Sequence, residues 1–519
     1  MGESLNRVAF QARTGIGAVS LLIVAMFLWT GCGSSSGDDD TVNLTGSGYP
    51  NGDLANTRNV SGPISTRNVT QLEEAWTLPL TGEGSFGSYA ASPVMSKGVV
   101  YSQDLGSNVQ AINQEDGEVI WTRSYEEPNL GPNGVVVGDG QVFGATASEA
   151  FALDQKTGKE LWSTPLTRNP KEGIDMAPGY DNGIVYVSTT PTNAGSLYAG
   201  EGVGILWALD GKTGKKLWKF NTVPNDLWGN PKVNSGGGLW YTPAFDGKGS
   251  MYFGVGNPAP FPGTAKDPYG SSRPGPNLYT NSIVKLDAKT GKMDWYFQLN
   301  PHDIYDWDLQ GPPMLVQSKG RQLVVAAGKV GYVVALDAKS GKLVWKRPVG
   351  IHNGHDQDGL YAMRGEYSKI KKGTVYPGVL GGVIAPISTD GTTVFAPIVN
   401  SPATAVSGSE TGEGGTVAPS GEIVALDVAT GAVKWKHKFP TAPAYGSTTV
   451  VNDLVFTTTA DGKVQGFDTS SGRLAWRVSL PAGTNAGVMA DGDTLIAAAG
   501  LATQEGQEPQ LVAYRLGDE

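Results

Sequence analysis

The chain of 519 residues is longer than one hydrophobic core usually supports, which leaves several domains or a repeat architecture. Gly contributes 73 residues and Trp 13, while charged residues make up only 17%, so many short strands joined by tight turns are expected. A net charge of −10, with no basic run beyond residues 369–372, argues against nucleic acid as a partner.

The first 31 residues have the pattern of a bacterial export signal. Arg7 and Arg13 precede an apolar stretch at residues 16–29, which is shorter than the roughly 20 residues that cross a membrane. We therefore predict a signal peptide at residues 1–31.

Cys32 is the only cysteine in the sequence, so an intrachain disulfide and a Cys-based zinc site are excluded. Trp29-Thr30-Gly31-Cys32 resembles a bacterial lipobox, although Trp29 stands where Leu is usual. The resemblance implies that Cys32 is lipidated and anchors an extracytoplasmic lipoprotein to the bacterial cell membrane. Simple secretion or an uncleaved anchor is the alternative. Residues 32–55 are predicted to include the lipidated Cys and a flexible tether, and residues 56–519 to form the folded domain.

A Trp-ended repeat runs through that domain. Asp154, Gly158 and Trp162 define it, with the Gly four residues before the Trp. The same spacing recurs at Asp210–Trp218, Asp287–Trp295, Asp337–Trp345, Asp427–Trp435 and Asp468–Trp476, and Asn113–Trp121 has Asn in place of Asp.

Each repeat has the pattern of a propeller blade. A strand ends at the Asp, whose carboxylate can accept N–H bonds in the next turn, and the Gly is free to take a positive φ. A second strand then delivers the Trp onto the next unit, and two β-rich runs precede each motif, which makes four strands per unit. The fold class is therefore an all-β propeller.

The chain ends are predicted to complete one blade together. Trp76 precedes the first full repeat, whereas residues 487–490, 494–499 and 510–515 supply three strands without a closing Trp. If residues 72–80 form the outer strand of the last blade, the open edge of a linear array disappears. The expectation is an eight-bladed propeller closed by its N-terminal strand.

The intervals before Trp218, Trp295 and Trp435 are the longest in the ladder, so blades three, four and six carry insertions where function is expected. The last of these includes a link at residues 351–377. Its His352, His355, Asp356 and Asp358 are expected to lie on a surface loop.

Four motifs around blade four resemble the quinoprotein alcohol dehydrogenases, whose eight-bladed propeller binds pyrroloquinoline quinone (PQQ) and a metal on its axis. They read GGGLW at 236–240, GVGNPAP at 254–260, RPGPNLYT at 273–280 and PHDIYDWD at 301–308. Their order and approximate spacing match that family.

The resemblance implies a metal site made of Glu201, Asn257, Asp306 and Asp308. Asn257 would offer its side-chain carbonyl, as hard cations prefer oxygen. Asp306 would also be the catalytic base. Asp308 matches a position where lanthanide-using relatives carry an additional acidic ligand, so the cation is expected to be calcium or a lanthanide.

The same resemblance implies that Trp240 is the aromatic floor of the quinone and that Lys329 lies against the quinone oxygens. The cation would act as a Lewis acid, and Asp306 would remove the alcohol proton while hydride passes to PQQ.

The chain also departs from that family. It lacks the vicinal disulfide under which many relatives hold PQQ, and Asn133-Gly134 stands in its place. Asp139 is expected where relatives offer an Arg to the PQQ carboxylates, and Asp175 where they carry a Thr. Because PQQ has three carboxylates, these acids weaken the case for the quinone more than the case for the cation.

The predicted function is a metal-dependent, extracytoplasmic PQQ-dependent dehydrogenase that oxidises a small alcohol and passes electrons to a respiratory acceptor such as a cytochrome. The alternatives are a cofactor-free propeller lipoprotein that scaffolds envelope assembly, and a metal-binding sensor or binding protein.

Overall fold

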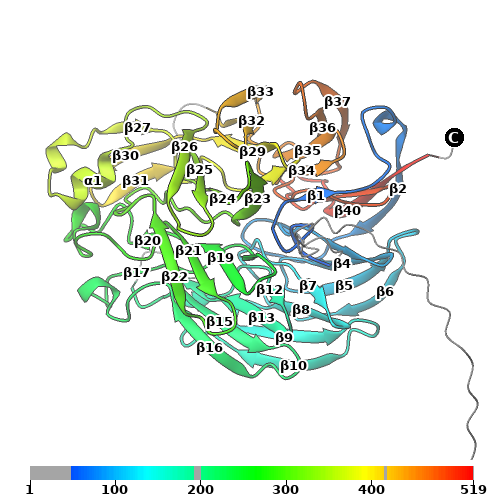
Figure 1. Ribbon diagram of the computed structural model, residues 1–519, viewed down its shortest axis with the longest axis horizontal. Helices are drawn as coiled ribbons and strands as arrows, with labels where there is room; N and C mark the ends of the chain where they lie inside the picture. The colour runs from blue at the N-terminus through cyan, green and yellow to red at the C-terminus, as the bar shows by residue number, and fades with distance from the viewer. Residues whose placement is uncertain (1–47, 192–199, 414–417, 518–519) are drawn as a thin grey trace, which may run out of the picture. The chain divides into compact units, whose positions relative to one another are not determined.

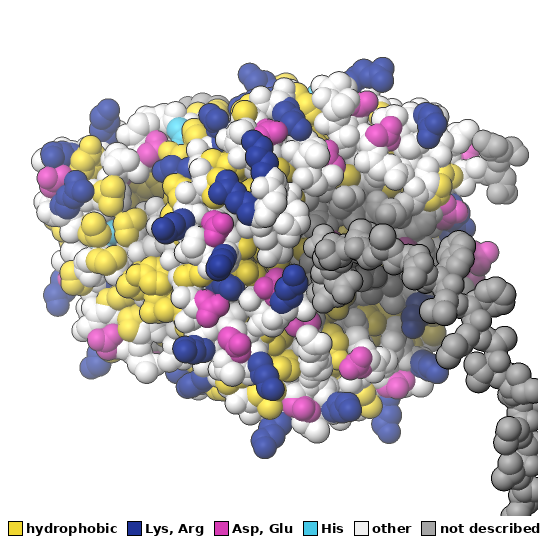
Figure 2. All heavy atoms as spheres, in the orientation of Figure 1, with side chains coloured by type: hydrophobic (Ala, Val, Ile, Leu, Met, Phe, Trp, Pro, Cys, Tyr) yellow, Lys and Arg dark blue, Asp and Glu magenta, His cyan; other side chains and the backbone are white. Residues whose placement is uncertain are grey.

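The computed structural model describes residues 48–191, 200–413 and 418–517 (Figure 1). The expected signal peptide and Cys32 lie outside the described residues. The described chain is β-structure almost throughout, with a single α-helix, α1 (Asp358–Met363). No helix within it is long and apolar enough to cross a membrane. Acidic and basic side chains are interspersed on the face in Figure 2 rather than gathered into a basic patch.

Eight antiparallel sheets follow one another along the chain, each with four strands of the repeat. Sheets one to four contain, in turn, β3 (Val94–Ser96), β4 (Val99–Gln103), β5 (Val109–Asn113) and β6 (Val119–Arg123); β7 (Val136–Gly138), β8 (Gln141–Ala145), β9 (Glu149–Asp154) and β10 (Glu160–Pro165); β12 (Gly179–Asp181), β13 (Ile184–Ser188), β15 (Ile205–Asp210) and β16 (Lys216–Asn221); β18 (Ala244–Phe245), β19 (Ser250–Gly254), β21 (Ser282–Asp287) and β22 (Met293–Gln298).

Sheets five to seven contain β23 (Met314–Ser318), β24 (Arg321–Ala327), β25 (Tyr332–Asp337) and β26 (Leu343–Pro348); β28 (Ser388–Thr389), β29 (Thr393–Asn400), β32 (Ser420–Asp427) and β33 (Val433–Phe439); β34 (Thr449–Val451), β35 (Leu454–Thr459), β36 (Lys463–Asp468) and β37 (Leu474–Ser479). The short β1 (Asn59–Val60) adds to β34 in parallel.

Sheet eight joins the two ends of the described chain. It consists of β38 (Met489–Asp491), β39 (Thr494–Ala499), β40 (Gln510–Leu516) and β2 (Leu72–Pro79). β2 pairs antiparallel with β40, and the blue strand lies beside the red one in Figure 1. The predicted pairing of the N-terminal strand with the last three strands is therefore observed.

A ladder of Trp residues connects each sheet to the next. A Cβ added at Gly431 would lie 2.5 Å from Trp345 Cε3, so only glycine leaves room for the indole there. A Cβ added at the equivalent glycine would lie 2.5–2.7 Å from the preceding Trp in seven pairs, which are Trp76–Gly117, Trp121–Gly158, Trp162–Gly214, Trp218–Gly291, Trp295–Gly341, Trp345–Gly431 and Trp435–Gly472. In all pairs but that of Trp218, the indole N–H also donates to a backbone carbonyl of the neighbouring turn.

Insertions occur in sheets three, four and six, as expected. They form the small sheets β11 (Glu172–Gly173) with β14 (Thr190–Pro191), β17 (Ser235–Gly236) with β20 (Pro258–Ala259), and β27 (Gly373–Val375) with β30 (Ala403–Ser407) and β31 (Glu410–Glu413). Short 3₁₀ turns are η1 (Val69–Gln71), η2 (Leu227–Gly229), η3 (Pro268–Gly270) and η4 (Tyr367–Lys369). The 351–377 link contains α1, η4 and β27.

Residues 48–60, called the inner segment below, run along the innermost strands. Carbonyls of this segment accept N–H bonds from sheets two, four, five, six and seven, through Val137, Phe245, Leu315, Thr389 and Val450. Residues 48–55 had been expected within the tether, but they are ordered against the sheets. Arg58 is fully buried in this segment, and its guanidinium donates to six described acceptors from sheets one, seven and eight and from the segment itself.

Candidate functional site

The segment at residues 302–308 connects sheet four to sheet five and is held by hydrogen bonds from within. The Asp303 carboxylate accepts the N–H groups of Tyr305 at 2.9 Å and Trp307 at 2.7 Å. Arg273, which is fully buried, donates to the carbonyl of Asp303 and to that of Pro260. Asp303 is therefore a structural residue of the segment, because both of its oxygens are occupied by backbone donors.

Asp306 and Asp308 meet Lys329, which lies at the end of β24. Lys329 Nζ donates to Asp306 Oδ2 at 2.7 Å and lies 3.5 Å from Asp308 Oδ2. Asp306 has a left-handed backbone with φ of 62°, a conformation that a non-Gly residue retains only where its surroundings fix it. Three of the predicted site residues are thus brought together.

The charges at this point do not balance within the protein. Asp308 is completely buried, and neither of its carboxylate oxygens has a hydrogen-bond donor. Burial raises the pKa of Asp306 to about 6 and raises the pKa of Asp308 well above its usual value, while Lys329 opposes both shifts. Burial alone would lower the pKa of Lys329, but Asp306 and Asp308 raise it. One ammonium therefore serves two buried carboxyls.

A shell of neutral groups from sheets four, five and six surrounds these charges. Gln310 Oε1 accepts the N–H of Lys329, and its amide nitrogen lies 3.4 Å from the carbonyl of Ile384. Tyr241 donates its hydroxyl to the same carbonyl at 2.9 Å. Burial raises the pKa of Tyr241, and Asp308 adds to the shift, so its hydroxyl stays protonated beside the site. The sequence patterns did not single out Gln310 or Tyr241, although each lies within two residues of a predicted site residue.

Trp240 and Asn257 lie together beside sheet four. A Cβ added at Gly256 would lie 3.0 Å from Trp240 Nε1, so the glycine allows the ring to approach the backbone next to Asn257. The Asn257 amide nitrogen donates to the carbonyl of Pro258 at 3.2 Å, and no described residue donates to its amide oxygen. The start of this same segment, Gly254, lies against the carbonyl of Leu309, next to Asp308.

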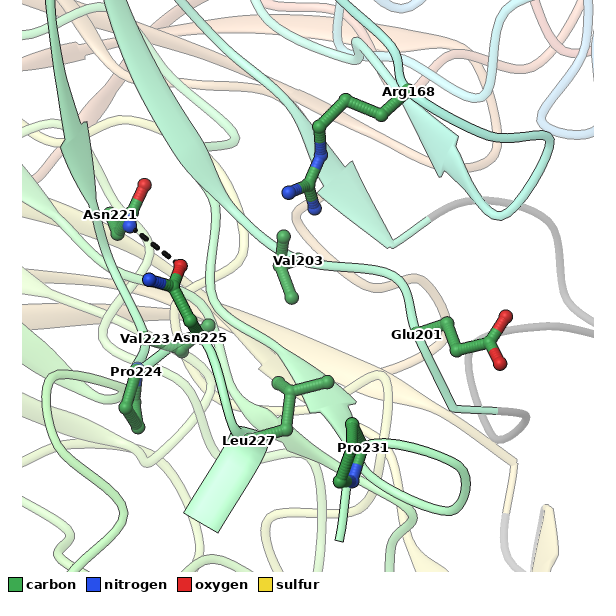
Figure 3. Close-up of a pocket in the computed structure, with 9 residues that line it drawn as sticks. All are labelled: Arg168, Glu201, Val203, Asn221, Val223, Pro224, Asn225, Leu227 and Pro231. Atoms are coloured by element: carbon green, nitrogen blue, oxygen red, sulfur yellow. Dashed lines mark hydrogen bonds between the residues drawn. The ribbon is translucent and has the colours of Figure 1, made fainter. Parts of the chain in front are cut away.

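Glu201 differs from Asp306 and Asp308 in its exposure and its contacts. Its side chain is 55% exposed and forms an ion pair with Lys171 at 3.4 Å, and no described contact joins it to Asp306 or Asp308. It borders a cavity of about 140 Å³ whose lining includes Arg168 and Leu227, and Figure 3 shows the carboxylate directed away from the other lining residues. The metal role of Glu201 stays a prediction that rests on the family resemblance.

Asp175 of sheet three and Trp240 of sheet four occupy equivalent positions. Each lies three residues before the Pro that precedes the innermost strand of its sheet, β12 or β18. It is fully buried, and its Oδ2 has no hydrogen-bond partner. Burial raises the pKa of Asp175 to about 7, although the N–H of Leu130 opposes the shift. The amide oxygen of Asn133, in the preceding sheet, is likewise buried and without a donor.

Two expectations about acidic residues were wrong. Asp139 does not face a cofactor site, because it lies exposed in the turn between β7 and β8, where its carboxylate accepts the Tyr180 hydroxyl. In the 351–377 link, His355 and Asp358 are not on a surface loop. Their side chains are only 5% and 2% exposed, because the link folds back onto the 302–308 segment.

The described residues fit a hard cation. Asp308 offers two buried oxygens without donors, and Asp306 and Asn257 add oxygens of the kind that such cations prefer. No three His, Cys, Asp or Glu side chains of the described chain converge closely enough to hold a metal alone. Other oxygens would therefore have to complete the coordination, which for calcium takes about six to eight ligands.

The fit to a quinone is partial. Trp240 offers an aromatic ring and Lys329 a cation. Asp175, however, adds a carboxyl group, which does not favour binding of a cofactor that itself carries carboxylates.

The sheets in series and the Trp–Gly ladder define a protein of the β-propeller type. The family model described as "Glucose/ethanol/alcohol dehydrogenase, beta-propeller domain" matches residues 174–350. The model described as "Outer membrane protein assembly factor BamB" matches residues 64–203 and 381–518, which together exceed half of the chain. Because the second model covers more than half of the chain, the chain belongs to the family of β-propeller proteins that this model describes, and its residues 174–350 are similar to the alcohol dehydrogenase propeller domain.

The chain also resembles individual quinohemoprotein alcohol dehydrogenases. The quinohemoprotein alcohol dehydrogenase ADH-IIG of Pseudomonas putida is 30% identical over 305 residues, which cover 52% of this chain and 40% of the relative. The matched region thus spans less than half the length of that relative. Its solved structure superimposes with a TM-score of 0.78 at 24% identity, over 91% of this chain and 80% of that one. A europium-containing methanol dehydrogenase superimposes with a TM-score of 0.73 at 20% identity, over 90% and 97%. These superpositions show the shared fold.

Proposed function

We propose that this protein is an extracytoplasmic quinoprotein dehydrogenase that oxidises a small alcohol, with PQQ as hydride acceptor and calcium or a lanthanide as the metal. Electrons would pass to a respiratory acceptor such as a cytochrome. The observation that carries this proposal is the buried Asp308 carboxylate, which has no donor and shares one ammonium with Asp306. A propeller that only scaffolds other proteins does not need two buried acids with so little compensation.

Each site residue has a distinct part in the proposed reaction. Bound PQQ and its cation supply the hydride acceptor and the Lewis acid. Asp306 accepts the hydroxyl proton of the alcohol at its carboxylate, and Lys329 favours the ionised form that can do so. Asp308 and Asn257 would hold the cation, and Trp240 would offer its ring to the planar cofactor.

The finer architecture proposed here is a closed propeller of eight blades, one for each sheet. Contact between the innermost strands of sheets one and eight, β3 and β38, supports closure. So does Trp76 of sheet eight, which packs on Gly117 of sheet one. Closure would place the inner strands around one axis, near which Asp306, Asp308 and Lys329 would lie.

Cofactor retention tests the function directly. Purified protein is incubated with PQQ and calcium or lanthanum and dialysed, and retained PQQ is measured by absorbance before dye reduction with ethanol is assayed. We expect retention that depends on the cation and is lost in Asp308→Asn, with Asp427→Asn, a change in a repeat turn, as the matched control. Failure to retain PQQ with any metal would overturn the proposal.

The second candidate is a cofactor-free propeller that assembles envelope proteins. The match to the assembly-factor model at residues 64–203 and 381–518 favours it, as does the buried acid Asp175. This candidate predicts no retained PQQ and equal thermal midpoints with and without added cation.

We also propose that Cys32 carries a lipid and anchors the protein to the bacterial cell membrane. The lipobox-like run before Cys32 supports this. Cells grown with labelled palmitate should yield labelled protein, and Cys32→Ser should abolish the label. An unlabelled wild-type protein would favour simple secretion or an uncleaved anchor.

A further inference from the structure

The two neighbours of Asp306 are both held by the 351–377 link. Tyr305 donates its hydroxyl to Asp358 Oδ2 at 2.8 Å, and Trp307 donates its indole N–H to the carbonyl of Pro377 at 2.9 Å. Both aromatic side chains are buried, and their ring centroids lie 5.0 Å apart. The residue between them therefore has its backbone fixed from both sides by one distant stretch of chain.

The carboxylate that holds Tyr305 is itself fixed. Asp358 Oδ2 also lies 2.7 Å from His355 Nδ1, and the His355 ring meets the Tyr305 ring edge to face at 6.1 Å. The backbone of α1 lies close to the same segment, because a Cβ added at Gly359 would lie 2.2 Å from the carbonyl oxygen of His302. The link thus contacts the 302–308 segment at its start, at Tyr305 and at Trp307.

A second His–Asp–Tyr set in the link provides a natural comparison. His352 Nδ1 lies 2.6 Å from Asp356 Oδ1, which accepts the Tyr332 hydroxyl at 3.2 Å. Its His and Asp side chains are 14% and 25% exposed, against 5% and 2% in the first set. Tyr332 begins β25, so this set fixes the link to sheet five without contacting the 302–308 segment.

We infer that the 351–377 link is a positioning element for Asp306, with Asp358 as its principal positioning residue. The inference rests on the proposed function of Asp306. Left-handed backbone at a non-Gly residue needs support from its surroundings, and here Asp358 and Pro377 supply that support on either side. The direction of the Asp306 carboxylate toward Lys329 and Asp308 then depends on a residue that contacts neither of them. Partners that orient ligands in this way typically change metal affinity by about 10–100-fold when removed.

The test compares Tyr305→Phe with Tyr332→Phe, since each removes one hydroxyl that donates to an aspartate of the link. Metal-free protein is titrated with terbium(III), and cation affinity is measured by Trp-sensitised luminescence. We expect Tyr305→Phe to weaken terbium binding by about 10–100-fold. Tyr332→Phe should bind as the wild type does. Asp358→Asn, whose amide oxygen can still accept the Tyr305 hydroxyl, should bind terbium within a few fold of wild type.

Hydrogen exchange provides a readout that needs no ligand. Backbone amides at residues 302–308 should exchange faster in Tyr305→Phe than in Tyr332→Phe, with the rest of the chain unchanged. Gly359→Ala, which pushes α1 away from His302, should speed exchange of the same residues. Equal exchange in the two Tyr variants would overturn the inference. Wild-type protein that binds neither terbium nor PQQ would instead overturn the proposed function, while the exchange comparison would still decide the role of the link.

Discussion

The aspartates of the repeat turns and the aspartates of the candidate site differ in how many donors they receive. In the turn after β32, Asp427 Oδ1 accepts both the N–H and the hydroxyl of Thr430, and this hydroxyl lowers the pKa of Asp427. No donor meets either Asp308 oxygen in good hydrogen-bond geometry, Lys329 Nζ being 3.5 Å from Oδ2, and burial raises the pKa of Asp308. An aspartate is structural where turn donors surround it, as at Asp427, and is a candidate ligand where they are missing, as at Asp308. Three of four predictions test this contrast, and the other tests the Trp–Gly ladder.

The largest effect is expected at Asp306. Asp306→Asn removes the proposed proton acceptor without changing its size, so kcat for the alcohol should fall by about 10²–10⁴-fold in protein loaded with PQQ and cation. The measurement is steady-state dye reduction, with Asp427→Asn as the control. A fall of less than about threefold would place the proton acceptor elsewhere.

Asp175 should make stability depend on pH. Its folded pKa of about 7 lies above the unfolded value of 3.8, so between these values the native state keeps a proton that the unfolded state releases. Wild-type stability is therefore expected to fall as pH rises through this window. Asp175→Asn should abolish the fall, with a gain of up to about 4 kcal/mol at pH 8 and little change at pH 4. Urea unfolding of the metal-free protein at the two pH values measures it, and equal gains at both would contradict this account.

The glycine of a repeat turn should affect stability through its contact with the Trp of the preceding repeat. Gly431→Ala forces a Cβ to within 2.5 Å of Trp345 at a φ of 67°, whereas Gly320 has a φ of 76° and nothing within 4 Å of an added Cβ. Gly431→Ala should therefore destabilise by about 1–3 kcal/mol more than Gly320→Ala. Urea unfolding should separate the two variants, and equal losses would mean that only the backbone conformation matters.

The smallest effect is expected at Asp427. Asp427→Ala removes hydrogen bonds of a partly exposed turn, so the loss should be about 1 kcal/mol or less at pH 7, with activity unchanged. Because the folded pKa is depressed, this contribution is present above the unfolded pKa and is lost as pH falls through the folded one. Thermal midpoints at pH 7 and pH 3 test this, and a loss that persists at pH 3 would argue against it.

Much of the fold could be predicted because its determinants are local. The Asp, Gly and Trp of each repeat lie within nine positions of one another, and the structure places every ladder Trp but Trp476 on the Gly of the next repeat. The proximity of Asp306 and Asp308 was equally accessible, since only Trp307 separates them in the sequence, although the left-handed backbone at Asp306 departs from an extended run.

Other features depend on how distant segments pack. The burial of Asp358 follows from the link folding back onto Tyr305, 53 positions away, and no local pattern reveals it. Asp139 was misplaced for a related reason. Its place in the sequence does not show that it falls in the turn between β7 and β8, where its side chain is exposed. The role of Arg58 could not be predicted, because its acceptors Ser92, Thr448 and Val488 lie far apart in the sequence.

The inner segment has a consequence for the order in which the protein is made. Arg58 bonds to the carbonyl of Thr448, 390 positions later, and β2 has no partner until β40 exists. At about 5–20 residues per second, a ribosome needs roughly 20–90 s between the two strands. During that time β2 has an unpaired edge, which chaperones can bind and which can pair with strands of other chains and aggregate. The newborn chain must therefore be shielded at its beginning until its end has emerged.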